Sequence, residues 1–492
     1  MGWLSLAIWT PIVIGALLLL FGKDSQVNLA RWIALLGSIV SFLVTLPLYT
    51  GFKLGTADMQ FVENVPWIER FNVNYHLGID GLSVWFVLLT AFITIIVVIA
   101  GWEVIQRRVN QYMASFLILS GIMIGVFCAL DGVLFYFFFE ATLIPMYLII
   151  GVWGGPNRIY AAFKFFLYTL LGSFLMLVGF IYLYAKSGGS FDIAVWQQLP
   201  LSSTAQTLLF FALFAAFAVK VPMWPVHTWL PDAHVEAPTG GSIVLAAIML
   251  KLGAYGFVRF SMPILPDASR QWAWLMIALS LIAVIYVGLV ALVQKDMKKL
   301  VAYSSVAHMG FVTMGFFIFS NLGISGGLIQ MIAHGFVSGA MFLCIGVLYD
   351  RLHTREIAAY GGVINVMPRF GAFALLFFMA NCGLPGTAGF VGEWMVILAS
   401  VRANFWLGLL LATALISGAG YSLWMFKRVY FGAVTNDNVR KKMPDINWRE
   451  CTALAVLAIA VLWMGLYPKP MTDVMQASVA KLVQQVSVSK LN

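Results

Sequence analysis

Residues 207–225 read TLLFFALFAAFAVKVPMWP, an apolar run in which Lys220 stands just before two prolines. Each proline lacks a backbone N–H and crowds the carbonyl four residues earlier, so a helix should break here. In a bilayer, backbone groups freed by a break are tolerated only where protein or water can satisfy them. The stretch therefore predicts a discontinuous membrane helix whose lysine faces a hydrated interior.

The composition of the whole chain agrees with a membrane protein. Hydrophobic residues make up 62% and charged residues 10%, which excludes an ordinary soluble domain. Apolar runs of roughly 18 to 25 residues recur, whereas a transmembrane barrel would show alternating segments of about ten. We predict an all-α polytopic membrane protein with about fourteen transmembrane helices, centred near Val13, Val40, Thr90, Ile122, Met146, Leu175, Phe214, Ile248, Ala283, Val312, Phe342, Met379, Ala414 and Val461. The first run lacks a small-residue cleavage site and reads as a retained helix.

A second interruption occurs at residues 381–393, NCGLPGTAGFVGE, inside an apolar stretch too long for one straight crossing. Two interrupted helices are typical of transporters. Spans four to eight and nine to thirteen would form two five-helix units, with Lys220 and Glu393 on the fourth helix of each. Because five is odd, the second unit is inverted. The predicted regions are a three-helix region (1–110), a first unit (111–262), a second inverted unit (272–432) and a C-terminal helix with a short tail (433–492).

Basic residues in the connections predict the orientation. With the amino terminus outside, about 17 Lys and Arg residues fall on the inward side and about 9 outside, so we predict both termini outside. This count puts Arg259 in an outward connection and makes Lys298 an inward surface anchor. The net charge of +9 follows from this bias and needs no nucleic-acid partner. The four cysteines show no ligand spacing and no phosphate-binding loop occurs, so we expect no metal or cofactor on this chain.

Four charged residues lie within the predicted membrane spans, where charge is unfavourable: Glu140, Lys220, Lys251 and Glu393. Each costs roughly 2.5 to 3.5 kcal/mol near the bilayer centre, which favours a conduction path. Glu140 would tune the proton affinity of Lys220, and Lys251 would be a central relay. The alternatives are a structural ion-paired Glu140, a Lys251 that reaches the surface or pairs with a carboxylate, and a Glu393 that only stabilises a helix terminus.

Histidines supply further candidates. His308 and His334 lie between Lys251 and Glu393 in the chain and are either proton carriers or simply hydrogen-bonded core residues. The connection after the break holds a polar cluster whose spacing fits no standard zinc site, so it reads as a proton-access vestibule or a solvated turn. Its members are His227, Asp232, His234 and Glu236.

Several long motifs together resemble the subunit M family of bacterial NADH-quinone oxidoreductase, the counterpart of mitochondrial NADH dehydrogenase subunit 4. They are KVPMWPVHTWLPDAHVEAPTGGSIVLAAIMLK at 220–251, HLGIDGLSVWFVLLT at 76–90, FFFEATLIPM at 137–146, QKDMKKLVAYSSVAHMG at 294–310 and NCGLPGTAGFVGE at 381–393. The resemblance covers nearly the whole chain. It implies an antiporter-like, proton-pumping subunit of respiratory complex I with broken helices seven and twelve.

The resemblance also implies residue roles and partners. Glu140 and Lys220 match the family's charged pair and Lys251 its central lysine, while His308 and His334 match the connecting polar axis and Glu393 the terminal residue of the second half. FMN, iron-sulfur clusters and quinone would be held by other subunits of the enzyme. The implied partners are the sibling subunits L and N and membrane lipids, in a bacterial inner membrane.

Two features favour subunit M over its siblings. Subunits L and N carry lysine where Glu393 stands, and subunit L ends in a long lateral helix, whereas this chain stops about 25 residues after its last predicted span. Mrp-type cation/proton antiporter subunits and membrane-bound hydrogenase subunits share looser versions of the motifs and remain alternatives. A structural membrane subunit, whose charges only hold broken helices together, is a further one.

Overall fold

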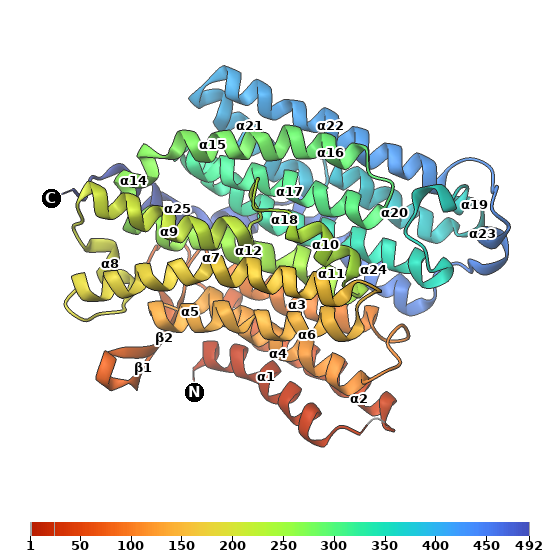
Figure 1. Cartoon of the computed structure of the whole chain (residues 1–492), viewed down its shortest axis with the longest axis horizontal. Helices are drawn as coiled ribbons and strands as arrows, with labels where there is room; N and C mark the ends of the chain where they lie inside the picture. Colours follow the sequence, from red (N-terminus) through yellow and green to blue (C-terminus); the bar gives the residue numbers. More distant parts are fainter. Residues whose placement is uncertain (1, 24, 492) are drawn as a thin grey trace.

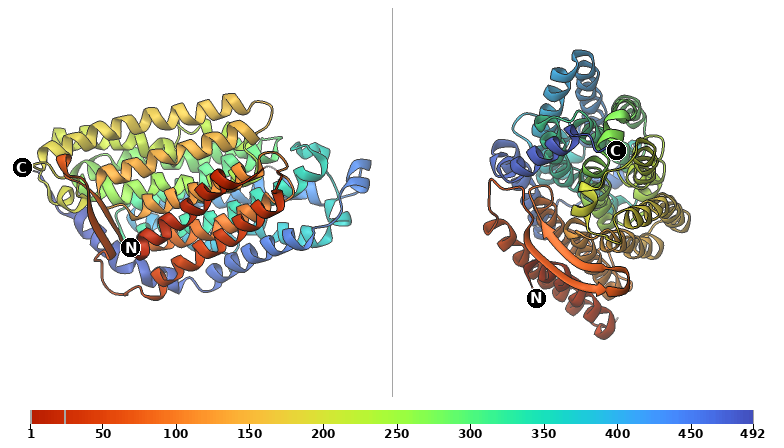
Figure 2. Two further views of the ribbon diagram at one scale, coloured as in Figure 1. Left: turned by 90° about the horizontal axis from the view of Figure 1, so that it is seen from below. Right: turned by 90° about the vertical axis from the view of Figure 1, so that its left-hand side faces the viewer.

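The chain folds into a bundle of long helices that lie side by side, with a small hairpin at one end (Figure 1 and Figure 2). The computed structural model describes residues 2–23 and 25–491. Within them, 12 helical segments are long and apolar enough to cross a membrane. The shorter helix Val84–Ala100 and a broken helix over residues 368–403 complete the predicted set of spans. The predicted all-α polytopic fold is confirmed.

The N-terminal region holds three membrane helices and a hairpin that the sequence analysis did not predict. Its elements are α1 (Trp3–Phe21), α2 (Val27–Thr50), β1 (Gln60–Ile68), η1 (Glu69–Phe71), β2 (Val73–Ile79) and α3 (Val84–Ala100). The strands pair antiparallel, with Gln60 opposite Ile79. Asn72 takes a left-handed conformation at the turn, where asparagine is among the residues that tolerate it best.

The first unit contains the predicted break. Its elements are α4 (Val109–Cys128), α5 (Gly132–Ala141), α6 (Leu143–Trp153), α7 (Arg158–Lys186), α8 (Ile193–Gln198), α9 (Ser203–Lys220), α10 (Trp229–Glu236), α11 (Thr239–Val244), η2 (Leu245–Met249), α12 (Leu250–Gly256), η3 (Phe257–Ser261) and α13 (Met262–Ile264). Helix α9 ends at Lys220, and residues 221–228 are non-helical up to α10. The discontinuous seventh span is confirmed.

The second unit repeats this order in the opposite direction. Its elements are α14 (Pro266–Gln271), α15 (Ala273–Ile282), η4 (Ala283–Val287), α16 (Gly288–Leu292), α17 (Met297–Phe317), α18 (Asn321–Leu352), η5 (Ile357–Ala359), α19 (Val363–Val366), α20 (Pro368–Asn381), α21 (Ala388–Ala403) and α22 (Phe405–Tyr430). Gly383 and Gly386 lie between α20 and α21 and have positive φ, a backbone conformation that interrupts the helix and that glycine adopts without strain. In Figure 1, α9 to α10 runs left to right and α20 to α21 right to left, as inverted units require.

The C-terminal region ends in a helix where the sequence predicted only a short tail. It contains α23 (Asp437–Lys442), α24 (Trp448–Leu466) and α25 (Lys469–Ser487). On α25, Met471, Val474 and Met475 are buried. Ser478 accepts a hydrogen bond from the backbone of Gly81, so α25 packs against the segment between the hairpin and α3.

Two basic residues lie deeper than predicted. Arg259 is in η3, within a membrane span, and forms a bidentate ion pair with Asp80 at 2.6 and 2.9 Å, so its placement in an outward connection is wrong. Lys298 is 4% exposed and donates to the Ala237 carbonyl at 2.7 Å, so it is not a surface anchor. In both cases a polar partner from a distant part of the chain removes the need to reach water.

Candidate functional site

Lys251 lies at the centre of the bundle and is fully buried. The helix before it has π geometry over Leu245–Met249, a pattern that loosens the usual backbone ladder and is frequent at functional sites. The Lys251 ammonium donates to the Ala246 carbonyl in this turn and lies 2.6 Å from Nδ1 of His334 on α18. Lys251 therefore does not reach the surface, and among the described residues it pairs with no carboxylate.

The polar run continues from His334 toward the second broken helix. The ring centroids of His334 and His308 are 5.7 Å apart. His308 Nδ1 lies 2.7 Å from a Glu393 carboxylate oxygen, and its Nε2 lies 3.0 Å from the Asn381 side-chain oxygen. Gln330 donates to the same Glu393 oxygen at 3.2 Å. Four predicted site residues, Lys251, His334, His308 and Glu393, thus form one buried series.

Residues on both sides of the break in the twelfth span contribute to the site around Glu393. Asn381 is the last residue of α20, and Glu393 lies in the second turn of α21. Helix α21 approaches α18 closely at Gly392, where an added Cβ would lie 2.6 Å from the Gln330 backbone nitrogen. Only glycine permits this approach, which brings Gln330 and Glu393 within hydrogen-bond distance.

Lys220 ends α9 and points toward the junction of α5 and α6. Its ammonium donates to the Thr142 hydroxyl at 3.2 Å and the Phe139 carbonyl at 3.5 Å. It also lies 4.3 Å from the centre of the Phe139 ring, a cation–π contact. The free carbonyls of a helix C-terminus favour a cation in this position.

Glu140 lies near Lys220 without touching it. The described residues provide no hydrogen bond to either shielded Glu140 oxygen, and no ion pair within 4.0 Å joins it to Lys220. The two charges still act on each other. The ion-paired structural glutamate that the sequence left open is therefore not observed in the part of the chain that the structure describes.

The parts of the site around Lys220 and around Lys251 come together within the first unit, where α9 packs on α12. An added Cβ on Gly253 would lie 2.9 Å from the Cβ of Lys220. Gly253 is two residues from Lys251, so both lysines stand on helices in close contact. Within the described residues, 2–23 and 25–491, no hydrogen bond links Lys220 directly to Lys251.

Some functional neighbours were not singled out from the sequence. Gln330 and Thr142 contact Glu393 and Lys220, respectively. An uncharged polar residue in an apolar helix is a weak signal, although Gln330 lies four residues before His334 on the same face. The Asp80–Arg259 pair was missed because its members are far apart in sequence; Arg259 also donates to Tyr255, at 2.9 Å.

The polar cluster after the first break separates in space. Asp232 pairs with Lys164 at 2.7 Å, and Glu236 accepts from the Asn157 backbone at 2.9 Å. His234 is fully buried and stacks on Phe342 at 4.3 Å between ring centroids. Among the described residues, no group of three or more His, Cys, Asp or Glu side chains is placed to hold a metal ion.

Comparison with known proteins covers both halves of the chain. The family model described as "NADH:quinone oxidoreductase/Mrp antiporter, TM" matches residues 129–417, and "NADH-ubiquinone oxidoreductase chain 4, amino terminus" matches residues 30–129. NADH-quinone oxidoreductase subunit M of Rhodobacter capsulatus is 50% identical, over 98% of this chain and 96% of that protein. NADH-ubiquinone oxidoreductase chain 4 of Arabidopsis thaliana is 46% identical, over 96% of this chain and 95% of that protein.

Solved structures share the fold. A chain of respiratory complex I from Thermus thermophilus with bound NADH matches with a TM-score of 0.90 and 31% identity, over 98% of this chain and 99% of that chain. A chain of the Mrp complex from Dietzia matches with a TM-score of 0.84, but at 20% identity and over only 55% of that chain, which shows a common fold alone. The sequence relatives and the family models agree, and the chain belongs to the family of NADH-quinone oxidoreductase subunit M and NADH-ubiquinone oxidoreductase chain 4.

Proposed function

We propose that this chain, an antiporter-like proton-translocating subunit of NADH-quinone oxidoreductase, moves protons along one buried axis of six residues. These are Glu140, Lys220, Lys251, His334, His308 and Glu393. The observation that carries the proposal is the buried series from Lys251 to Glu393, which begins at a π-helical turn and ends on a broken helix.

Each side chain of the axis can take and release a proton. Lys251 and His334 are 2.6 Å apart, and His308 and Glu393 are 2.7 Å apart, both within hydrogen-bond distance. The histidines, at 5.7 Å between ring centroids, need a ring rotation or a bridging water for transfer. An imidazole suits this task because it accepts a proton on one nitrogen and releases one from the other.

A change in ion pairing can supply the free energy needed to move a proton against the membrane potential. Moving one charge against 100 mV costs about 2.3 kcal/mol, equivalent to nearly two pKa units. Opposite charges about 4 Å apart interact by about 4 kcal/mol at an effective dielectric constant of 20. Moving Glu140 toward or away from Lys220 would therefore shift the proton affinity of the lysine enough to drive transfer.

Both chain ends lie at the end of the bundle that carries the hairpin, opposite α19 and α23 (Figure 1 and Figure 2). The end with α19 and α23 holds basic residues such as Arg355, Arg369 and Arg440, which supports an inward orientation under the positive-inside rule. Both termini then face the periplasm of a bacterial inner membrane. Subunits L and N are the proposed neighbours, and the flavin, iron-sulfur clusters and quinone would be held by other subunits.

The proposal is tested with Lys220→Ala and Glu140→Gln in inside-out membrane vesicles. We expect NADH-driven proton pumping and quinone reduction to fall together by about tenfold or more. NADH oxidation by an artificial acceptor should persist, since that reaction uses only the redox subunits. Lys186→Ala, an exposed lysine at the end of α7, is the control. Normal pumping in both variants would refute the axis, and loss of assembly on native gels without a specific transport defect would indicate a purely structural subunit.

A further inference from the structure

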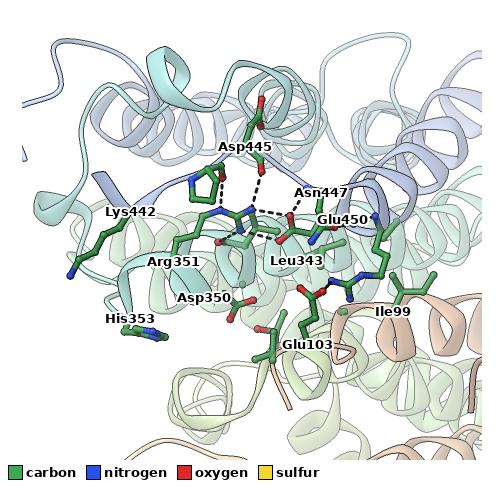
Figure 3. Close-up of a pocket in the computed structure, with 18 residues that line it drawn as sticks. Ile99, Glu103, Leu343, Asp350, Arg351, His353, Lys442, Asp445, Asn447 and Glu450 are labelled. Carbon is green, nitrogen blue, oxygen red and sulfur yellow. Dashed lines mark hydrogen bonds and ion pairs between the residues drawn. The ribbon is translucent and has the colours of Figure 1, made fainter. Parts of the chain in front are cut away.

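A cavity of about 680 Å³ opens at the inward end of the bundle, among α3, α18, the start of α24 and the connection before α24 (Figure 3). It reaches the surface, because Lys442, Pro444 and Asn447 line it and are exposed. A second cavity of about 190 Å³ continues it toward the start of α11. Both are lined by Ala100, Val104, Thr239 and Asp350.

Several of the charged side chains that line the two cavities are already in ion pairs. Three arginines each hold a carboxylate: Arg351 with Glu450, Arg449 with Glu103, and Arg355 with Asp296. Asp350 differs, since the described residues give its side chain no ion pair and no hydrogen bond. Figure 3 shows its carboxylate apart from the bonded network around Arg351. Asp350 is therefore an available carboxylate at the point where the two cavities join.

Lys298 lines the second, smaller cavity and lies deeper in the protein than Asp350. Its ammonium donates to the carbonyl of Ala237, just after the end of α10, and lacks a carboxylate within ion-pair distance among the described residues. The charges of Arg355, Asp296, Asp350 and Glu236 act on it. A buried lysine held only by a backbone carbonyl can release its proton more readily than one in an ion pair.

His234 lies close enough to Lys298 and to Lys251 for the charges of both to act on it. It is fully buried, and both ring nitrogens lack a hydrogen-bond partner in the described part of the chain. It stacks on Phe342, which lies midway along α18 between His334 and Asp350, about 12 Å along the helix from each.

We propose that these cavities are the inward proton-uptake route, in which Asp350, Lys298 and His234 deliver protons to Lys251. The Asp350 carboxylate takes a proton from water at the surface and passes it to the neutral Lys298 amine. The resulting ammonium protonates one nitrogen of His234, and the other nitrogen releases a proton to neutral Lys251. This route rests on the proposed function, because it ends on the central lysine of the axis.

A structural role for Lys298 must be separated from proton transfer. Lys298 and Arg355 both donate to carbonyls at the C-terminal end of α10, where cations stabilise a helix. Lys298→Arg keeps that stabilising charge, but arginine does not release its proton in proteins. We expect Lys298→Arg to assemble normally and to lose pumping about tenfold or more. Pumping at the rate of the unmodified complex would overturn the route through Lys298.

Asp350 is tested by chemical rescue in inside-out vesicles, whose outer surface is the inward side of the membrane. Asp350→Asn should lower pumping and quinone reduction by about tenfold or more, and Asp350→Glu should retain most of both. Imidazole added to the medium should restore Asp350→Asn, because a small diffusible acid can enter the outer cavity. Glu356→Gln, an exposed inward carboxylate outside the cavities, is the matched control and should need no rescue.

The outcomes distinguish this inference from the axis itself. Normal pumping by Asp350→Asn, or equal losses in the Asn and Glu variants without rescue, would overturn the uptake route. Lys251→Met reports on the axis separately, since it should abolish pumping and resist imidazole. If Lys251→Met pumps normally, the proposed function fails; if it is inactive while Asp350→Asn is normal, only the uptake route fails.

Discussion

Arg259→Met should destabilise the subunit strongly, because it strips a buried carboxylate of its partner. Arg259 and Asp80 are 4% and 5% exposed, and the guanidinium bonds both oxygens of Asp80, at 2.6 and 2.9 Å. The methionine side chain retains much of the apolar volume of arginine but has no N–H group to donate a hydrogen bond to Asp80. Asp80 would then be a buried charge that retains only hydrogen bonds from the segment around Leu82.

The size of the effect follows from the burial of the pair. Removing one partner of a buried ion pair costs about 3 to 5 kcal/mol. With an unfolding entropy of about 2.1 cal/mol/K per residue, the 492 residues of this chain give about 1 kcal/mol/K. The midpoint of thermal unfolding should therefore fall by about 3 to 5 °C.

The assay is the temperature at which the purified complex loses this subunit on a native gel, compared with Lys186→Met, an exposed basic residue at the end of α7. Asp80→Asn combined with Arg259→Met should recover more than half of the loss, because asparagine removes the unpaired charge and keeps an acceptor for the Leu82 backbone. If the double variant is as unstable as the sum of the two single ones, the ion pair does not couple the residues and the reasoning is wrong.

Three further outcomes are expected. Glu393→Lys should retain more pumping than Glu393→Ala in the vesicle assay, because the Gln330 side-chain oxygen finds no hydrogen-bond partner in the described part of the chain and can accept from an ammonium; equal losses would contradict this. Gln330→Leu should lower pumping about tenfold while the subunit still assembles, since a hydrogen bond to a charged group contributes about 1.5 to 3 kcal/mol; an unchanged rate would show that this bond is not used. Burial raises the pKa of Asp131, just before α5, to about 6, so its contribution to stability is full below pH 4 and is lost as the pH rises through 6. Asp131→Asn should abolish that pH dependence in amide exchange of Val133 and Leu134, and a dependence that persists would assign it to another group.

The sequence predicted the membrane spans and both helix breaks because these depend on local chemistry. Apolar run length identifies a span, and the prolines after Lys220 and the glycines near Pro385 mark the interruptions without knowledge of neighbours. The hairpin and α25 were missed for the same reason. They lie outside the spans, in segments that contain no long apolar run.

Contacts between distant segments were beyond the sequence alone. Lys251 and His334 are 83 residues apart, and nothing local indicates that His334, rather than His308, meets the lysine. The chain order of the candidates even differs from their spatial order, since His334 comes between Lys251 and His308 in space. Arg259 was misplaced because its partner is 179 residues away.

The π-helical turn Leu245–Met249 fixes the rotational phase of the rest of its span. It accommodates one residue more than an α-helical turn, and each residue of an α-helix accounts for about 100° of rotation. Deleting one residue there would rotate Lys251, Tyr255 and Arg259 together, away from His334, Phe127 and Asp80. One inserted residue thus aligns the central lysine and the buried arginine at the same time, and the length of this turn is as constrained as the identity of the side chains that follow it.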